Sequence, residues 1–120
     1  FFAPNHTYDL NTFNALKKAG LYRIIDGYGL SPFVKNDINF LPQLFYKLIF
    51  IPVGIQSTQL HINYWNENDF IKFENFVKKH HSKIIDIDTA FSKKSENLLI
   101  KILNVFIEPV LKLKRIFAKS

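Results

Sequence analysis

The stretch Phe2-Ala3-Pro4-Asn5-His6-Thr7-Tyr8-Asp9 is a short apolar run that ends in polar and titratable residues. Two later segments share this pattern, Ile25-Asp26-Gly27-Tyr28-Gly29 and Thr58-Gln59-Leu60-His61. Strands that run parallel bring such residues together, because their carboxyl ends meet at one edge of the sheet. The three segments therefore predict an α/β fold with a functional site at the strand ends.

The residues between the first two segments predict a strand-helix-strand unit. Thr7 or Asp9 can cap a helix over residues 10–19, whose apolar positions share one face and which ends before Gly20. Residues 22–26 are predicted to form a buried strand that enters a glycine-containing turn. Short connections between such elements are typical of parallel α/β folds.

The middle of the chain predicts a loop followed by strands. Residues 31–39 are predicted to form a surface loop, and Pro42 argues against a central strand in the apolar run that follows. Alternating apolar and polar residues predict a strand over 55–62, and a short strand is expected over 84–87.

A second helix is predicted over residues 67–80. Asn66 can cap it, acidic residues lie in its first turn and lysines in its last, and both placements suit the helix dipole. Phe70, Phe73 and Val77 fall at helical spacing and predict its buried stripe.

The segment from Ser95 onward predicts a long amphipathic helix that is kinked or interrupted at Pro109. All charged residues after Glu108 are basic, so this end can lie on an anionic membrane surface. The alternative is a helix that packs on the body of the protein and exposes its basic face to water. Its apolar face consists of Leu99, Ile102, Leu103, Phe106, Val110, Leu113 and Phe117.

Composition limits the class of protein. With 120 residues, 48% of them hydrophobic, the chain is one domain or part of one and has enough apolar material for a packed core. It has no Cys, and therefore no disulfide and no thiolate metal ligand. The absence of Met and the apolar start favour a fragment or a processed product.

The net charge of +6 fits either an anionic partner or a lysine-rich surface that keeps the chain in solution. We expect no nucleic-acid partner, because the chain has no Gly-rich phosphate loop and only Arg23 and Arg115 as arginines. A cytoplasmic or membrane-peripheral location agrees with these features.

In order and spacing, the three polar-ended segments resemble the last three motifs of the polysaccharide deacetylase (NodB-type) family, in a divergent branch. Phe2-Ala3-Pro4-Asn5 stands at the third motif, Asp26 at the fourth and Leu60-His61 at the fifth. The resemblance implies that residues 1–90 form the C-terminal part of a distorted (β/α) barrel. Residues 91–120 would then be a C-terminal amphipathic helical extension.

The resemblance also implies a reaction, the removal of acetyl groups from an acetylated carbohydrate with a divalent metal such as zinc. This reaction needs a metal-bound water, a carboxylate base and an acid that protonates the departing amine. His61 would be the acid, because histidine holds and releases a proton near neutral pH, and Asp26 would orient it. Gln59 and His61 share one face if the predicted strand is regular.

The resemblance further implies that Asn5, His6 and Tyr28 bind the substrate, and the Trp65 ring is a candidate for stacking on a sugar. The family's metal ligands belong to its first two motifs, which this chain lacks, so no metal ligand is expected here and an N-terminal half is an expected partner. Phe2 also stands where the family has Arg.

Each candidate has a structural alternative. Asp26 precedes a glycine-containing turn and can simply start it, and His6 can cap a helix or hydrogen-bond locally. His61 can be a hydrogen-bonded structural residue, and Trp65 can serve packing. The chain as a whole is thus part of a deacetylase, a non-catalytic sugar-binding remnant, or a basic module that docks on a membrane or an acidic partner.

Overall fold

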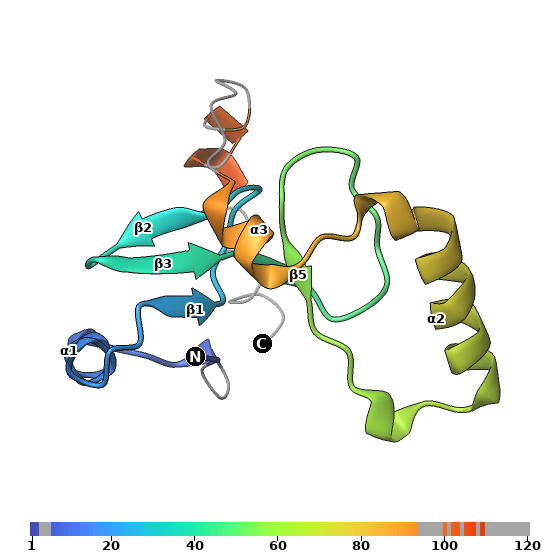
Figure 1. The fold of residues 1–120 in the computed structure, drawn as a ribbon, viewed down its shortest axis with the longest axis horizontal. Helices are drawn as coiled ribbons and strands as arrows, with labels where there is room; N and C mark the ends of the chain where they lie inside the picture. Colours follow the sequence, from blue (N-terminus) through green and yellow to red (C-terminus); the bar gives the residue numbers. More distant parts are fainter. Residues whose placement is uncertain (3–5, 94–99, 101, 104, 108, 110–120) are drawn as a thin grey trace.

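The structure is a computed structural model, which describes residues 1–2, 6–93, 100, 102–103, 105–107 and 109. It is a mixed α/β arrangement with two small sheets (Figure 1). In chain order its elements are α1 (Leu10–Lys18), β1 (Arg23–Ile25), β2 (Phe33–Lys35), β3 (Ile38–Leu41), β4 (Gln43–Phe45), β5 (Ser57–Thr58), the 3-10 turn η2 (Ile62–Tyr64), α2 (Glu67–His80), the 3-10 turn η3 (His81–Lys83) and α3 (Ile87–Ser92).

The first predicted helix is confirmed as α1, and its cap is Asp9 and not Thr7. The Thr12 backbone N–H donates to the Asp9 carboxylate at 2.8 Å, while the Asp9 N–H donates to Thr12 Oγ1 at 3.3 Å. Together they form a capping box. Gly20 follows the helix with φ +73°, the left-handed conformation that glycine adopts at helix ends.

The core lies between α1 and the three-stranded sheet. Phe40 of β3 is its centre, with 1% of its surface exposed. The Phe33 ring stacks on Phe40 at 4.9 Å, and the Phe13 ring from α1 meets it edge-on at 6.1 Å. Leu16, Ile24 and Ile38 complete the buried cluster. This burial of apolar surface attaches the helix to the strands.

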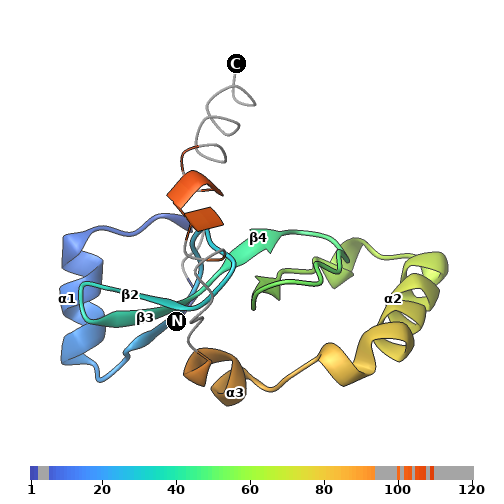
Figure 2. The ribbon, with the colours of Figure 1, turned by 90° about the horizontal axis from the view of Figure 1, so that it is seen from above.

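Two pairs of strands in the structure are parallel. β1 pairs with β3 in parallel, with Ile24 beside Phe40, and β4 pairs with β5 in parallel. On the other edge of β1, the Phe1 amino group donates to Arg23 O at 2.8 Å and the Ile25 N–H donates to Phe1 O at 3.0 Å. β3 leads into β4 across the molecule (Figure 2), so the carboxyl ends of these parallel segments point to the same side of the fold.

The loop predicted over residues 31–39 is wrong, because β2 and β3 form an antiparallel hairpin there. Asn36 and Asp37 make its two-residue turn with φ +52° and +62°. Asn and Asp tolerate this left-handed conformation, and turns of this kind match the twist of paired strands. Because the two turn residues are polar, the sequence pattern indicates a loop there, and the short strands beside them are not predicted.

Pro42 lies between β3 and β4, and it is fully buried. The prediction that Pro42 argues against a central strand is wrong for β3, which ends just before Pro42 and is the middle strand of its sheet. Proline cannot donate a ladder hydrogen bond. Its carbonyl instead accepts from Ser57, from the N–H at 2.7 Å and from Oγ at 3.1 Å. Pro42 therefore stands where β3 ends and pairing with β5 begins.

Two other predicted strands differ from the structure. The strand expected over 55–62 is reduced to Ser57–Thr58, and the next turn is η2. The strand expected over 84–87 is wrong, because Asp86 caps α3 by accepting from the Thr89 N–H at 2.8 Å. α3 packs against β3, and Arg23 of β1 pairs with Asp88 and lies 5.1 Å over the Phe91 ring.

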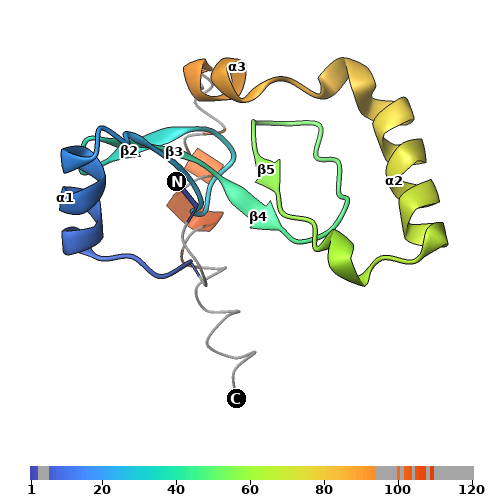
Figure 3. The same cartoon turned by 60° about the horizontal axis from the view of Figure 1, so that its bottom comes forward.

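The second predicted helix is confirmed as α2, with Asn66 as its cap and Asp69 completing a capping box. Its predicted stripe is not buried, since Phe70 and Phe73 are 50% and 38% exposed. The Trp65 ring packs on both of them, at 5.3 and 5.5 Å. Figures 1 and 3 show why: α2 stands apart from the sheet, and the loops at its two ends connect it to β5 and α3.

A cavity of about 580 Å³ lies between the sheet and α2. Its lining is mostly apolar and includes Leu41 and Phe45 from the strands, Phe73 and Val77 from α2, and Ile84 from the segment before α3. The apolar face of α2 thus borders this cavity and does not join the core.

The C-terminal helix is described at residues 100, 102–103, 105–107 and 109, all helical. There Ile102, Leu103 and Phe106 are exposed, and the rest of the predicted apolar face lies outside the described residues. Among the described residues, no helix is both long enough and apolar enough to cross a membrane. The strands that are described do not close a barrel, so the barrel, the division at residue 90 and the membrane contact stay predictions.

Gly54 offers a test of this chain path. It has φ +78°, and a Cβ atom there would lie 2.0 Å from the Leu30 carbonyl oxygen, which accepts the Ile55 N–H at 2.7 Å. We expect Gly54→Ala to lower the free energy of unfolding, measured in urea, by about 2 kcal/mol more than Gly20→Ala does. Gly20 is the matched control, because its φ is similar and no atom lies within 4 Å of its Cβ position. Equal losses in the two variants would contradict the close approach at Leu30.

The cap of α1 makes stability depend on pH. The backbone hydrogen bond from Thr12 lowers the pKa of Asp9 below its usual value of 3.8. The ionised Asp9 cap therefore stabilises the folded state above that value, and this stabilisation is lost as the pH falls through the lowered pKa. Asn accepts the same hydrogen bond without titrating. We therefore expect the melting temperature to fall less between about pH 5 and pH 2 in Asp9→Asn than in the wild type, as measured by thermal unfolding.

Candidate functional site

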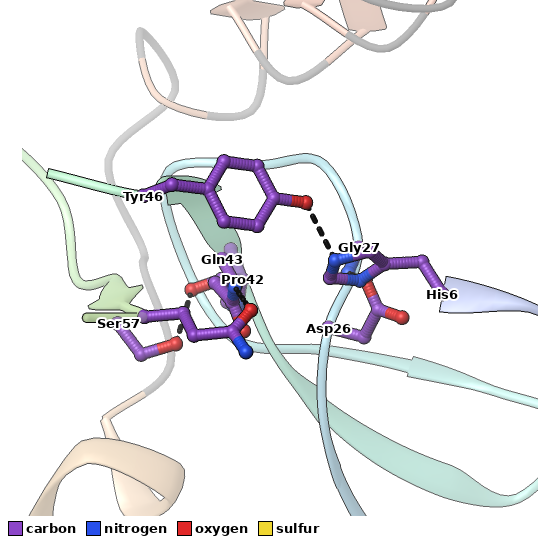
Figure 4. Close-up of polar contacts among 8 residues, drawn as sticks. His6, Asp26, Gly27, Pro42, Gln43, Tyr46 and Ser57 are labelled. Atoms are coloured by element: carbon purple, nitrogen blue, oxygen red, sulfur yellow. Dashed lines mark hydrogen bonds and ion pairs between the residues drawn. The ribbon is translucent and has the colours of Figure 1, made fainter. Parts of the chain in front are cut away.

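Three side chains, His6, Asp26 and Tyr46, form a hydrogen-bonded chain at the carboxyl ends of the parallel segments (Figure 4). Asp26 follows β1 directly, Tyr46 follows β4 and His6 lies on the segment that leads into α1. His6 Nδ1 lies 2.8 Å from Asp26 Oδ1, and Tyr46 Oη lies 2.5 Å from His6 Nε2. Both ring nitrogens of His6 therefore take part in hydrogen bonds.

The Asp26 carboxylate is buried, with 5% of the residue exposed. Its Oδ1 also accepts the Gly27 N–H at 2.5 Å, and its own N–H donates to Leu41 O at 3.0 Å. Its Oδ2 is buried and has no hydrogen-bond partner among the described residues. Leaving a buried acceptor unpaired costs about 1–3 kcal/mol, and such atoms are found where function requires them.

The position of His6 fixes the proton on its ring. An ionised carboxylate only accepts hydrogen bonds, so Nδ1 carries a proton and donates a hydrogen bond to Asp26. In the neutral ring Nε2 is then the acceptor of a hydrogen bond that the Tyr46 hydroxyl donates. His6 also has φ +54°, an uncommon backbone conformation that clusters at functional sites. The Phe2 ring packs edge-on to the imidazole at 5.7 Å.

Tyr46 is a site residue that the sequence analysis missed. It stands directly after β4, just as Asp26 stands directly after β1, so the pattern of polar residues at strand ends would have indicated it. The shortness of β4 and the preceding Pro42 concealed this strand. Tyr46 is 46% exposed, so the hydrogen-bonded chain runs from a buried carboxylate to the protein surface.

A second polar group lies at the same edge. Gln43 of β4 is buried, and its Nε2 donates to Gln59 Oε1 at 3.1 Å. The Gln43 backbone N–H donates to Gly27 O at 3.1 Å, which places it beside the turn that holds Asp26. Figure 4 shows Gln43 and Ser57 in the same view as His6, Asp26 and Tyr46.

The structure brings together Asp26 and His6 from the predicted site, but it does not join His61 to them. His61 is exposed at the start of η2, and no hydrogen bond or ion pair links it to Asp26 among the described residues. β5 ends at Thr58, so the alternation that would have aligned His61 with Gln59 does not continue. Asp26 therefore orients His6 in this structure.

The other predicted substrate-binding residues are distributed differently. Tyr28 lies between the two glycines of the turn, and its hydroxyl is buried. The Trp65 ring packs on Phe70 and Phe73 of α2, which agrees with its structural alternative. Asn5, with Ala3 and Pro4, lies outside the described residues.

The described residues do not fit a metal centre. No three His, Asp or Glu side chains come together in the part of the chain that the structure describes, and the chain has no Cys. Catalytic zinc sites use three protein ligands.

The hydrogen bond between Tyr46 and His6 can be tested by stability. Tyr46→Phe removes the hydroxyl and leaves the ring, so we expect the free energy of unfolding to fall by about 0.5–1.5 kcal/mol. Tyr64→Phe is the matched control, because Tyr64 is 86% exposed. Urea denaturation measures both. A Tyr46→Phe variant as stable as Tyr64→Phe would show that the hydroxyl adds nothing to the folded state.

Comparison with known proteins found no matching family model, no matching curated protein and no matching solved structure.

Proposed function

We propose that this chain is part of a carbohydrate deacetylase and supplies the group that transfers a proton to the departing amine. The observation that supports this most is the buried Asp26 carboxylate held against the His6 imidazole at the carboxyl ends of parallel strand segments. The order of the polar-ended segments, which resembles the polysaccharide deacetylase family, supplies the substrate class.

The geometry suits proton transfer. Breaking the bond between the acetyl carbon and the sugar nitrogen requires a proton on that nitrogen as it leaves. Asp26 fixes the orientation of His6 through Nδ1 and stabilises the imidazolium, as carboxylates do in other carboxylate–imidazole pairs. For this step His6 is the imidazolium, formed when the ring takes up the proton released by the attacking water, and its Nε2 proton passes, directly or through the Tyr46 hydroxyl, to the amine.

The divalent metal that the resemblance implies would activate the attacking water, and its ligands would come from outside this chain. The chain's own contribution is therefore the acid side of the reaction. His6 and His61 are both candidates for the acid. Burial and the contact with Asp26 favour His6, whereas the resemblance favours His61.

A non-catalytic sugar-binding role uses the same polar edge and is the main alternative. It needs the hydrogen-bonding groups of Gln43, Gln59 and Tyr46 but no proton transfer. A sugar that binds and is not hydrolysed would favour it.

Acetate release decides between these roles. The full translation product of the gene is incubated with N-acetylglucosamine oligomers and Zn²⁺ or Co²⁺, beside the 120-residue chain. We expect hydrolysis by the full product, and a loss of about 100-fold or more in His6→Gln, because a general acid contributes that much. His81→Gln is the matched control, since His81 is exposed and bonds only its own helix end, Lys78 O, among the described residues.

Two outcomes of this assay would contradict the proposal. A full loss in His61→Gln with activity retained in His6→Gln would transfer the acid role to His61. No hydrolysis by the folded full product with either metal would overturn the deacetylase proposal.

A further inference from the structure

The cavity between the sheet and α2 is separate from the hydrogen-bonded chain at the strand ends, none of whose three side chains lines it. One wall is a single face of α2, on which Phe73, Phe76, Val77 and His80 recur at helical spacing. Figure 3 shows α2 on one side of this region and β4 and β5 on the other. Its volume of about 580 Å³ lies within the range of about 300–1,000 Å³ that small-molecule sites have.

Few polar groups of the lining are open to a ligand. The hydroxyl groups of Ser57 and Thr58 already donate to backbone carbonyls, at 3.1 and 2.9 Å. The Gln56 Oε1 atom is buried, so it is closed off from the space of the cavity. No Asp or Glu lines the cavity in the part of the chain that the structure describes. The side chains that remain to bind a polar ligand group are His80 and Lys83.

These two side chains lie close together in the chain, at one end of α2. His80 is the last residue of α2, and Lys83 ends η3, which follows directly. The His80 ring stacks on the Phe50 ring at 4.2 Å, so its nitrogen atoms lie at the edge of the stack, and a neutral imidazole offers one N–H. Lys83 is exposed and positively charged at neutral pH, and neither side chain has an acidic partner among the described residues. This end of the cavity therefore favours an anion, whereas the rest of its lining is mostly apolar.

We infer that the cavity binds one long-chain fatty acid. The carboxylate accepts hydrogen bonds from Lys83 and His80, and the hydrocarbon chain runs along Val77 and Phe73. A methylene group needs about the volume of one water molecule in the liquid, about 30 Å³, so a chain of about 12 to 14 carbons fits the cavity. A neutral alcohol would leave Lys83 without a counter-charge, and a sugar would place its hydroxyl groups against apolar side chains. The inference does not depend on the proposed function.

The fluorescence of Trp65 can report on binding. Trp65 is the only tryptophan of the chain, and its ring packs at 5.5 Å on that of Phe73, which lines the cavity. The 120-residue chain is titrated with dodecanoate, decanoate and dodecanol at micromolar concentrations. We expect the Trp65 emission to change until one dodecanoate is bound per chain. Decanoate should bind about tenfold more weakly, because each buried methylene group contributes about fourfold.

The charge of the head group is tested with dodecanol and with two variants. Dodecanol should bind about threefold more weakly than dodecanoate, because an exposed ion pair contributes that much. Lys83→Gln removes the charge, so it should weaken dodecanoate about threefold and leave dodecanol unchanged. Lys79→Gln is the matched control, since Lys79 is exposed on the same helix and does not line the cavity. Urea denaturation checks that both variants are folded.

Three results would overturn the inference. Dodecanol that binds as tightly as dodecanoate would show that the cavity does not recognise a carboxylate. Equal losses in Lys83→Gln and Lys79→Gln would assign the binding to the overall positive charge of the chain. A Trp65 emission that does not respond to dodecanoate, or does not saturate, would show that the cavity takes up no fatty acid.

Discussion

The parallel pairing of β1 with β3 is the constraint on which the rest of the structure depends. Its register sets Ile24 beside Phe40, and both side chains are buried against α1. The same register sets Ile25 beside Leu41, so Asp26 emerges next to Pro42, and Gln43 reaches the turn at Gly27. A slip of one residue would turn the buried side chains to the opposite face and would separate Asp26 from its neighbours. Core and site are thus fixed by one set of backbone hydrogen bonds.

The site combines groups that are costly to bury with groups that reach water. Asp26 has no Lys or Arg partner among the described residues and depends on His6 and on the Gly27 N–H. A buried carboxylate holds an imidazole firmly, because a hydrogen bond is stronger in surroundings of low dielectric constant. Tyr46 extends the chain to the surface. The Gln43–Gln59 pair at the same edge of the fold is uncharged.

Local signals in the sequence were reliable, and pairings between distant residues were not. The bounds of α1 and α2 follow from caps within three residues of each helix start, and both were predicted closely. The hairpin at Asn36 was missed because two polar turn residues look like a loop until the strands beside them pair. His6 was expected at the rim, but its bond to Asp26 depends on a contact 20 residues apart along the chain. Likewise, the apolar spacing of α2 indicates a buried face without saying what covers it.

Pro42 has a consequence for how the protein opens. It divides the ladder between a three-stranded sheet and a two-stranded one, and it contributes no amide proton to either. Cooperative units in proteins often coincide with such supersecondary pieces. The two sheets meet at this buried ring and its carbonyl, and the hydrogen bonds from Gln43 N–H to Gly27 O and between Tyr46 and His6 also join them. Asp26 belongs to one piece, whereas Tyr46 and Gln59 belong to the other, so the site exists only while both are closed.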